Sequence, residues 1–135
     1  ESFKAIASKL SEEFLPSKIL EIGSNDGVFI RNFDIEKVVA VEPCGNLAEM
    51  TSKMGYKTYT EFWNSDLANK IVKDNGKFDI IYSANTISHI PNLKEVFEAI
   101  LIGLSKNGVF VFETFYFLKN SHKFSKLKNK NTQKS

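Results

Sequence analysis

The sequence contains one cysteine, Cys44, two histidines and three prolines among its 135 residues. A single cysteine excludes an intrachain disulfide framework and a CxxC-type zinc site, so no bound metal is expected. It also favours a reducing, cytoplasmic location. No apolar run approaches the roughly 18 residues of a membrane-spanning helix, and the first residues lack the pattern of a signal peptide. What is left is a globular protein of ordinary composition, 42% hydrophobic and 25% charged.

Acidic residues are missing from the last part of the chain. Residues 119–135 contain six lysines and no aspartate or glutamate, whereas residues 1–118 contain 12 basic and all 16 acidic residues, a net charge of −4. The segment 119–135 is predicted to be a lysine-rich flexible tail. Residues 1–118 are long enough for one domain with a hydrophobic core. Because that domain is acidic overall, nucleic acid is not expected as a partner, although the lysines of the tail taken alone could suggest it.

The most informative stretch is a buried apolar run that ends in a glycine-bearing turn. Gly23 and Gly27 can adopt positive φ, and Asn25 between them tolerates the left-handed region better than most residues. The pattern predicts a strand, a turn and the start of a helix, with Asp26 near the helix amino terminus. Glu42 ends the next apolar run, about 20 residues further on, where a carboxylate can accept both hydroxyl hydrogens of a ribose. We therefore predict a nucleoside-containing cofactor across the carboxyl ends of these two strands. A strand-to-helix turn without a ligand is the alternative.

Apolar periodicity along the chain predicts alternating strands and helices. Helices are expected at 2–14, where the helical spacing of Phe3 and later apolar residues gives a face that packs on the sheet, from the glycine turn to about Phe33, at 45–54, which Gly55 ends, after a cap at Asn64 or Ser65, and from a cap at Asn92 to Leu104. Strands are expected at 18–22, 37–42, 57–60, 78–84 and 109–114, the last after a turn at 106–108. Five strand–helix alternations give an α/β fold, a mostly parallel Rossmann-like sheet with helices on both faces. Ligands of such sheets bind at the carboxyl ends of the strands.

The glycine turn lacks the G-x-G-x-x-G pattern of nicotinamide-cofactor proteins. Its acid and two glycines, Glu21, Gly23 and Gly27, resemble the first motif of class I S-adenosylmethionine-dependent methyltransferases, with Asn25 in place of the usual middle glycine. The resemblance implies that S-adenosylmethionine binds at this turn. The residues that it implies for cofactor binding are Glu21, Gly23, Ser24, Asn25, Gly27, Glu42, Pro43, Phe62 and Asn85.

Three residues that follow the third expected strand, Glu61, Phe62 and Trp63, would meet the adenine in this family. A purine favours an apolar or aromatic face, so Phe62 and Trp63 could form its wall. They could equally close the core under a loop. By the same resemblance the first helix, 2–14, would cover the cofactor pocket, and plain packing on the sheet is its alternative.

Two stretches taken together are similar to the central domain of the sugar C-methyltransferases. They are residues 21–27 and residues 84–91, the second of which contains His89. The resemblance implies C-methylation of a nucleotide-linked 4-keto-deoxysugar, with His89 as the general base that removes a proton α to the ketone. Thr86 and Ser88 stand where this family often has a tyrosine and a glutamate. A loop histidine with only local hydrogen bonds is the alternative.

Class I methyltransferase sheets normally have seven strands, whereas five are expected here. The sheet is therefore predicted to be truncated after strand five, with an exposed edge that a homodimer would cover. The cysteine-rich zinc region and the further C-terminal domain of the sugar C-methyltransferases have no counterpart in the sequence. Two other functions stay open: an O- or N-methyltransferase of another small metabolite, and a non-catalytic cofactor-binding remnant. Methylation of nucleic acid is not expected, because a D/N-P-P-Y-type loop is missing after the fourth strand.

Overall fold

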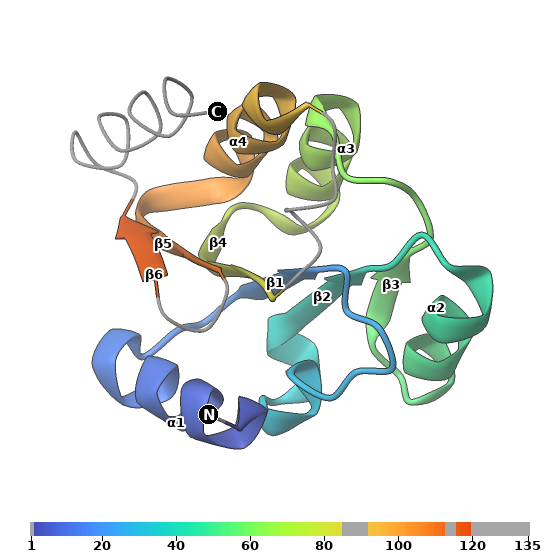
Figure 1. Ribbon diagram of the computed structural model, residues 1–135, viewed down its shortest axis with the longest axis horizontal. Helices are drawn as coiled ribbons and strands as arrows, with labels where there is room; N and C mark the ends of the chain where they lie inside the picture. The colour runs from blue at the N-terminus through green and yellow to red at the C-terminus, as the bar shows by residue number, and fades with distance from the viewer. Residues whose placement is uncertain (1, 85–91, 113–115, 120–135) are drawn as a thin grey trace.

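A sheet with helices on both faces forms the centre of the computed structural model, which describes residues 2–84 and 92–112 and the backbone of residues 116–119 (Figure 1). Within this described part the sheet has six strands in the order β3-β2-β1-β4-β5-β6. The first five are parallel and the last is antiparallel to its neighbour. Their bounds are β1 Ile19–Ile22, β2 Val38–Val41, β3 Lys57–Tyr59, β4 Phe78–Ser83, β5 Leu104–Phe112 and β6 Tyr116–Lys119. The predicted mostly parallel α/β fold is confirmed.

Two apolar layers hold the helices to the sheet. Helix α1, Phe3–Phe14, covers one face, and helices α3, Ser65–Asn75, and α4, Leu93–Gly103, lie side by side on the other (Figure 1). Successive strand residues point to opposite faces, so Ile19 joins the layer under α1 whereas Leu20 joins the layer under α3 and α4. No helix among the described residues is long and apolar enough to cross a membrane.

The helix ends follow the predicted capping residues. Asn64 caps α3 by accepting a hydrogen bond from the backbone N–H of Leu67, and Asn92 caps α4 in the same way. Helix α2, Gly45–Lys53, ends in a Schellman motif in which Gly55, at φ 98°, donates to the carbonyl of Ser52. The predicted role of Gly55 as the residue that ends α2 is confirmed.

The prediction of a helix between the glycine turn and Phe33 is wrong. In its place the chain forms one short 3₁₀ helix, Ile30–Asn32, and a second one, Ile35–Lys37, follows after Phe33. The side-chain amide of Asn32 donates to the carbonyl oxygens of Val28, at 3.1 Å, and Phe29, at 3.0 Å. It occupies carbonyls that an α-helix would use for its own backbone ladder, and such local bonds favour turns over helices.

The fifth strand also differs from the prediction. Helix α4 ends at Gly103 and β5 begins at once with Leu104, which pairs with Phe78 instead of extending the helix. The expected turn at 106–108 lies inside this strand, where the register between β4 and β5 shifts. A Cβ on Gly108 would lie 2.8 Å from the carbonyl oxygen of Phe78, so only glycine allows the two backbones to approach this closely.

Strand β6 was not expected. It pairs antiparallel with β5 and ends at Lys119, the first residue assigned to the tail. The edge of β5 that was predicted to be exposed is therefore covered by the chain itself. This removes the reason for expecting a homodimer through that edge.

Asp79 connects the start of β4 to the residues that lead into β1. Its carboxylate accepts hydrogen bonds from the backbone N–H and the hydroxyl of Ser17, both at 2.8 Å, and from the N–H of Lys18 at 3.1 Å. Burial alone would raise the pKa of Asp79, but these hydrogen bonds outweigh it and hold the pKa below its ordinary value.

Replacing Asp79 with alanine is expected to lower the free energy of unfolding by about 1–2 kcal/mol, because a partly exposed charged acceptor is lost. Since its folded-state pKa is lowered, the contribution is present above the unfolded-state pKa and disappears as the pH falls through the folded-state pKa. Urea unfolding at neutral and acid pH measures both effects. The control is Asp34→Ala, which removes a surface ion pair with Lys37 at 3.7 Å and should change stability by less than about 0.5 kcal/mol. An equal fall in the free energy of unfolding in the two variants would contradict the stabilising role assigned to Asp79.

Candidate functional site

The glycine turn follows β1 directly and is tied to the end of β2. The N–H groups of Gly23 and Ser24 both donate to the carbonyl oxygen of Val41, at 2.7 and 3.1 Å. Gly23, Asn25 and Gly27 have φ of 74°, 57° and 89°, so the predicted left-handed conformation of Asn25 is confirmed. The backbone of the turn is thereby open to close approach by a ligand.

Gly27 is needed for packing as well as for its positive φ. A Cβ at this position would lie 3.0 Å from Cε of Met54 and 3.1 Å from Cγ2 of Thr51. The turn therefore rests against helix α2, and a side chain at Gly27 would separate them.

Glu42 joins three segments at the carboxyl end of β2. Its side chain is 7% exposed, and its two carboxylate oxygens accept hydrogen bonds from the N–H of Asn25, at 2.8 Å, and of Cys44, at 2.9 Å. Its own N–H donates to the carbonyl of Tyr59 at 3.0 Å. Each carboxylate oxygen has two lone pairs, so both can still accept a hydroxyl hydrogen. Glu42 thus lies where the sequence predicts, and it also orders the turn.

Two buried side chains at this end of β1 each have an oxygen atom without a hydrogen-bond partner. Glu21 is 3% exposed and Ser24 is 2% exposed, and neither Glu21 Oε1 nor Ser24 Oγ has a hydrogen-bond partner. Burial raises the pKa of the Glu21 carboxyl well above its ordinary value, and the negative charges of Glu42 and Asp26 raise it further. Buried polar atoms are normally satisfied, so these two mark a place where a ligand can donate hydrogen bonds.

Glu21 and Ser24 both line a cavity of about 150 Å³. It is lined by Phe3, Glu21, Gly23, Ser24, Asn25, Asp26, Val28, Phe29 and Ala84. Its wall contains Phe29, which stacks on Tyr82 with ring centroids 3.8 Å apart, and Phe3 of α1, which meets both rings edge-on. Burial, and then the charge of Glu21, raises the pKa of Tyr82 to about 12. The prediction from the sequence missed this aromatic wall, although the helical spacing of Phe3 identified it as a residue facing the sheet.

The aromatic pair after β3 divides between core and surface. Trp63 is 6% exposed, belongs to the core under α3 and α4, and donates its indole N–H to the carbonyl of Val96 at 3.3 Å. The core interpretation therefore holds for Trp63, and its role as an adenine wall is wrong. Phe62 is 77% exposed and stays a predicted cofactor contact, while Glu61 forms an ion pair with Lys70 at 3.2 Å.

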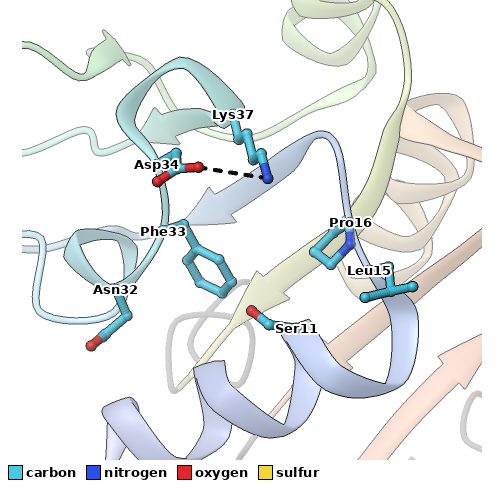
Figure 2. Close-up of a pocket in the computed structure, with 7 residues that line it drawn as sticks. All are labelled: Ser11, Leu15, Pro16, Asn32, Phe33, Asp34 and Lys37. Atoms are coloured by element: carbon cyan, nitrogen blue, oxygen red, sulfur yellow. Dashed lines mark ion pairs between the residues drawn. The ribbon is translucent and has the colours of Figure 1, made fainter.

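A larger cavity, of about 340 Å³, lies at the opposite end of the sheet. Figure 2 shows it between the end of α1 and the 3₁₀ segment before β2, with Asp34 and Lys37 forming an ion pair at 3.7 Å. Pro16 and Lys37 precede β1 and β2 in the chain, so this cavity is at the amino ends of the strands. Parallel sheets bind ligands at the other end, and the smaller cavity is the candidate site.

Some predicted residues lie outside the described part of the chain. Asn85 and His89 are among them, as are Thr86 and Ser88. Their roles stay predictions from the sequence. Pro43 lies next to Glu42 and is half-buried.

The strand order reverses between β1 and β4, and the glycine turn and Glu42 lie beside this switch point, at the carboxyl ends of β1 and β2. These features define the Rossmann-like fold of class I methyltransferases. The chain belongs to the methyltransferase-domain family, because residues 2–132 match the family described as "Methyltransferase domain".

One curated relative is the C-methyltransferase NovU of Streptomyces niveus, 27% identical over 103 residues that make up 75% of this chain and 24% of NovU. Solved structures with the same fold include DesVI of Streptomyces venezuelae, with a TM-score of 0.66 and 15% identity over 84% of this chain and 51% of DesVI. Another is a possible histamine N-methyltransferase of Thermotoga maritima, with a TM-score of 0.59 and 20% identity over 82% of this chain and 49% of that one. A third, the plantazolicin methyltransferase BamL, was solved with SAH bound; its TM-score is 0.63 at 18% identity over 80% of this chain and 43% of BamL. The chain thus spans about a quarter of the curated relative and about half of these structures.

Proposed function

We propose that this chain is the cofactor-binding part of an S-adenosylmethionine-dependent methyltransferase. The observation that carries the proposal is the buried carboxylate of Glu42, which is held by the N–H of Asn25 at the carboxyl end of β2. Asn25 also lines a cavity, together with Glu21 and Ser24, each of which has one buried oxygen without a hydrogen-bond partner. The family match and the bound SAH in the related BamL structure support the same cofactor.

The residues at the site fit the parts of this cofactor. Glu42 would accept the hydrogens of the two ribose hydroxyls, and the open backbone of the glycine turn would lie against the ligand. Glu21 and Ser24 would accept hydrogen bonds from the α-ammonium group at the amino-acid end. Phe62, whose ring is exposed, would offer an aromatic face to the adenine. Pro43 follows Glu42 directly in the chain and would lie near the ribose. The bound cofactor supplies the methyl group as an electrophile.

For the acceptor we propose a small molecule with a ketone, specifically a nucleotide-linked ketosugar that is methylated on carbon. His89 would remove the proton α to the ketone, because imidazole titrates near neutral pH and the carbon is not nucleophilic until that proton leaves. The name of the relative NovU, a C-methyltransferase, supports transfer to carbon. An O- or N-methyltransferase is the alternative, and it needs no base for a C–H bond. The single cysteine favours a cytoplasmic setting.

Calorimetric titration of the chain with S-adenosylmethionine and with S-adenosylhomocysteine tests the cofactor. We expect saturable binding of one equivalent, with a dissociation constant on the order of micromolar. Circular dichroism on the same sample establishes that the protein is folded. A folded chain that binds neither compound would overturn the proposal.

A further inference from the structure

Glu21 is the one carboxyl group among the described residues that is buried without a hydrogen-bond partner for one of its oxygens. In the sheet it lies between Ala40 of β2 and Tyr82 of β4, its register partners, and the three side chains share one face. Over this face Phe29 stacks on Tyr82, and Phe3 of α1 contacts both rings edge-on. Glu21 therefore lines the cavity on the face of the sheet that carries these aromatic rings.

Among the described residues, the charges that act on Glu21 are both acidic. Glu42 comes from the end of β2 and Asp26 from the glycine turn, and both disfavour a second negative charge here. From β4 comes the phenol of Tyr82, while Phe3 and Phe29 bring no charge from α1 and from the turn. An isolated buried carboxylate with two like charges nearby is costly, so the neutral acid is favoured and the pKa of Glu21 is raised.

We propose that Glu21 is protonated in the free protein and gives up its proton to solvent when the ammonium group of the ligand enters the cavity. The proposal rests on the proposed function and adds to it a coupling between cofactor binding and proton release. The O–H bond of the carboxyl group breaks, the proton passes to bulk water or buffer, and the carboxylate pairs with the incoming cation. The site thus avoids an unpaired buried charge before the ligand arrives.

The coupling sets the direction of the pH dependence. Below the pKa of Glu21 in the free protein, each ligand that binds must displace one proton, so the dissociation constant falls about tenfold per pH unit as the pH rises. Above that pKa the free protein already carries the carboxylate, and the dependence flattens. An α-amino group at the end of a peptide has an ordinary pKa of about 7.7–8.0, so below about pH 7 the ammonium group of the ligand stays protonated and that part of the profile reports on the protein.

The experiment is calorimetric titration of the chain with S-adenosylhomocysteine from about pH 5.5 to about pH 7.5, in two buffers of different ionisation enthalpy. The difference in apparent enthalpy between the buffers gives the number of protons released. We expect close to one proton per ligand at the acid end, together with the tenfold slope. Glu21→Gln should bind more weakly, release no proton from this position and lose the slope. Because the variant keeps His89 and every other titratable group, the difference between the two profiles belongs to Glu21.

Glu49→Gln is the matched control, since Glu49 is exposed on α2, where it forms an ion pair with Lys53 at 3.0 Å. Its profile should equal that of the unsubstituted chain. Ligand binding with a flat pH profile and no proton release would overturn this inference and leave the proposed function standing. A folded chain that binds no ligand at any pH would overturn both.

Discussion

Replacing Glu42 with alanine is expected to raise the dissociation constant for S-adenosylhomocysteine by about 5- to 150-fold. The range corresponds to the 1–3 kcal/mol that a charged hydrogen-bond acceptor contributes at a buried position. Two effects combine in the variant. The ribose hydroxyls lose their acceptor, and the N–H groups of Asn25 and Cys44 lose the carboxylate that orders the turn. Titration calorimetry at one pH compares the variant with the unsubstituted chain.

The second effect can be separated from the first. Since Asn25 and Cys44 lose their partner even without a ligand, the melting temperature of the free protein should also fall in Glu42→Ala. Glu42→Gln keeps one acceptor oxygen, so its dissociation constant and its melting temperature should both lie between those of the unsubstituted chain and Glu42→Ala. Glu49→Ala on the exposed face of α2 should change neither. An unchanged dissociation constant in Glu42→Ala would refute the ribose assignment.

Replacing His89 with glutamine is expected to slow methyl transfer to carbon by about 10²- to 10⁴-fold, the usual contribution of a positioned general base. Glutamine has similar size but cannot take up a proton at neutral pH. The dissociation constant for the cofactor should stay unchanged, because the prediction assigns His89 to the acceptor and not to the cofactor. Transfer of a labelled methyl group to a nucleotide-linked 4-ketosugar measures the rate.

His122→Gln serves as the matched histidine control and should leave the rate unchanged, since His122 belongs to the predicted tail. Full activity of His89→Gln on the ketosugar would refute the base role. Transfer to a hydroxyl or amine acceptor that survives His89→Gln would favour the O- or N-methyltransferase alternative. An unsubstituted chain that binds the cofactor but methylates no acceptor would favour the non-catalytic alternative.

The local pattern of the sequence was enough to predict most of the architecture. Continuous apolar runs marked the buried parallel strands, and Asn64, Asn92 and Gly55 marked helix ends correctly. The spacing between the glycine turn and Glu42 placed both at one edge of the sheet, because consecutive parallel strands end on the same side. These features depend on residues close together in the chain, so the sequence records them directly.

The sequence also misled in places where local and distant contacts compete. Leu104 continues the helical periodicity of α4, yet it begins β5 because pairing with Phe78 buries it completely. Trp63 follows β3 in the position of an adenine wall. Its indole ring is instead buried in the core under α3 and α4, and its N–H donates to the carbonyl of Val96. Periodicity cannot show which of two burial sites a side chain will occupy.

By itself, then, the sequence determined the α/β class, the glycine turn with its left-handed asparagine, and the acidic residue that follows the second strand. Only the tertiary structure decided that the Glu42 carboxylate binds the N–H groups of Asn25 and Cys44. It also decided that Glu21 is buried in the site lined by Phe3 and Phe29, with one carboxyl oxygen that has no hydrogen-bond partner. The physical reason is that hydrogen bonding and desolvation depend on distances between segments far apart in the chain. Such distances are set by the packing of the whole sheet and its helices.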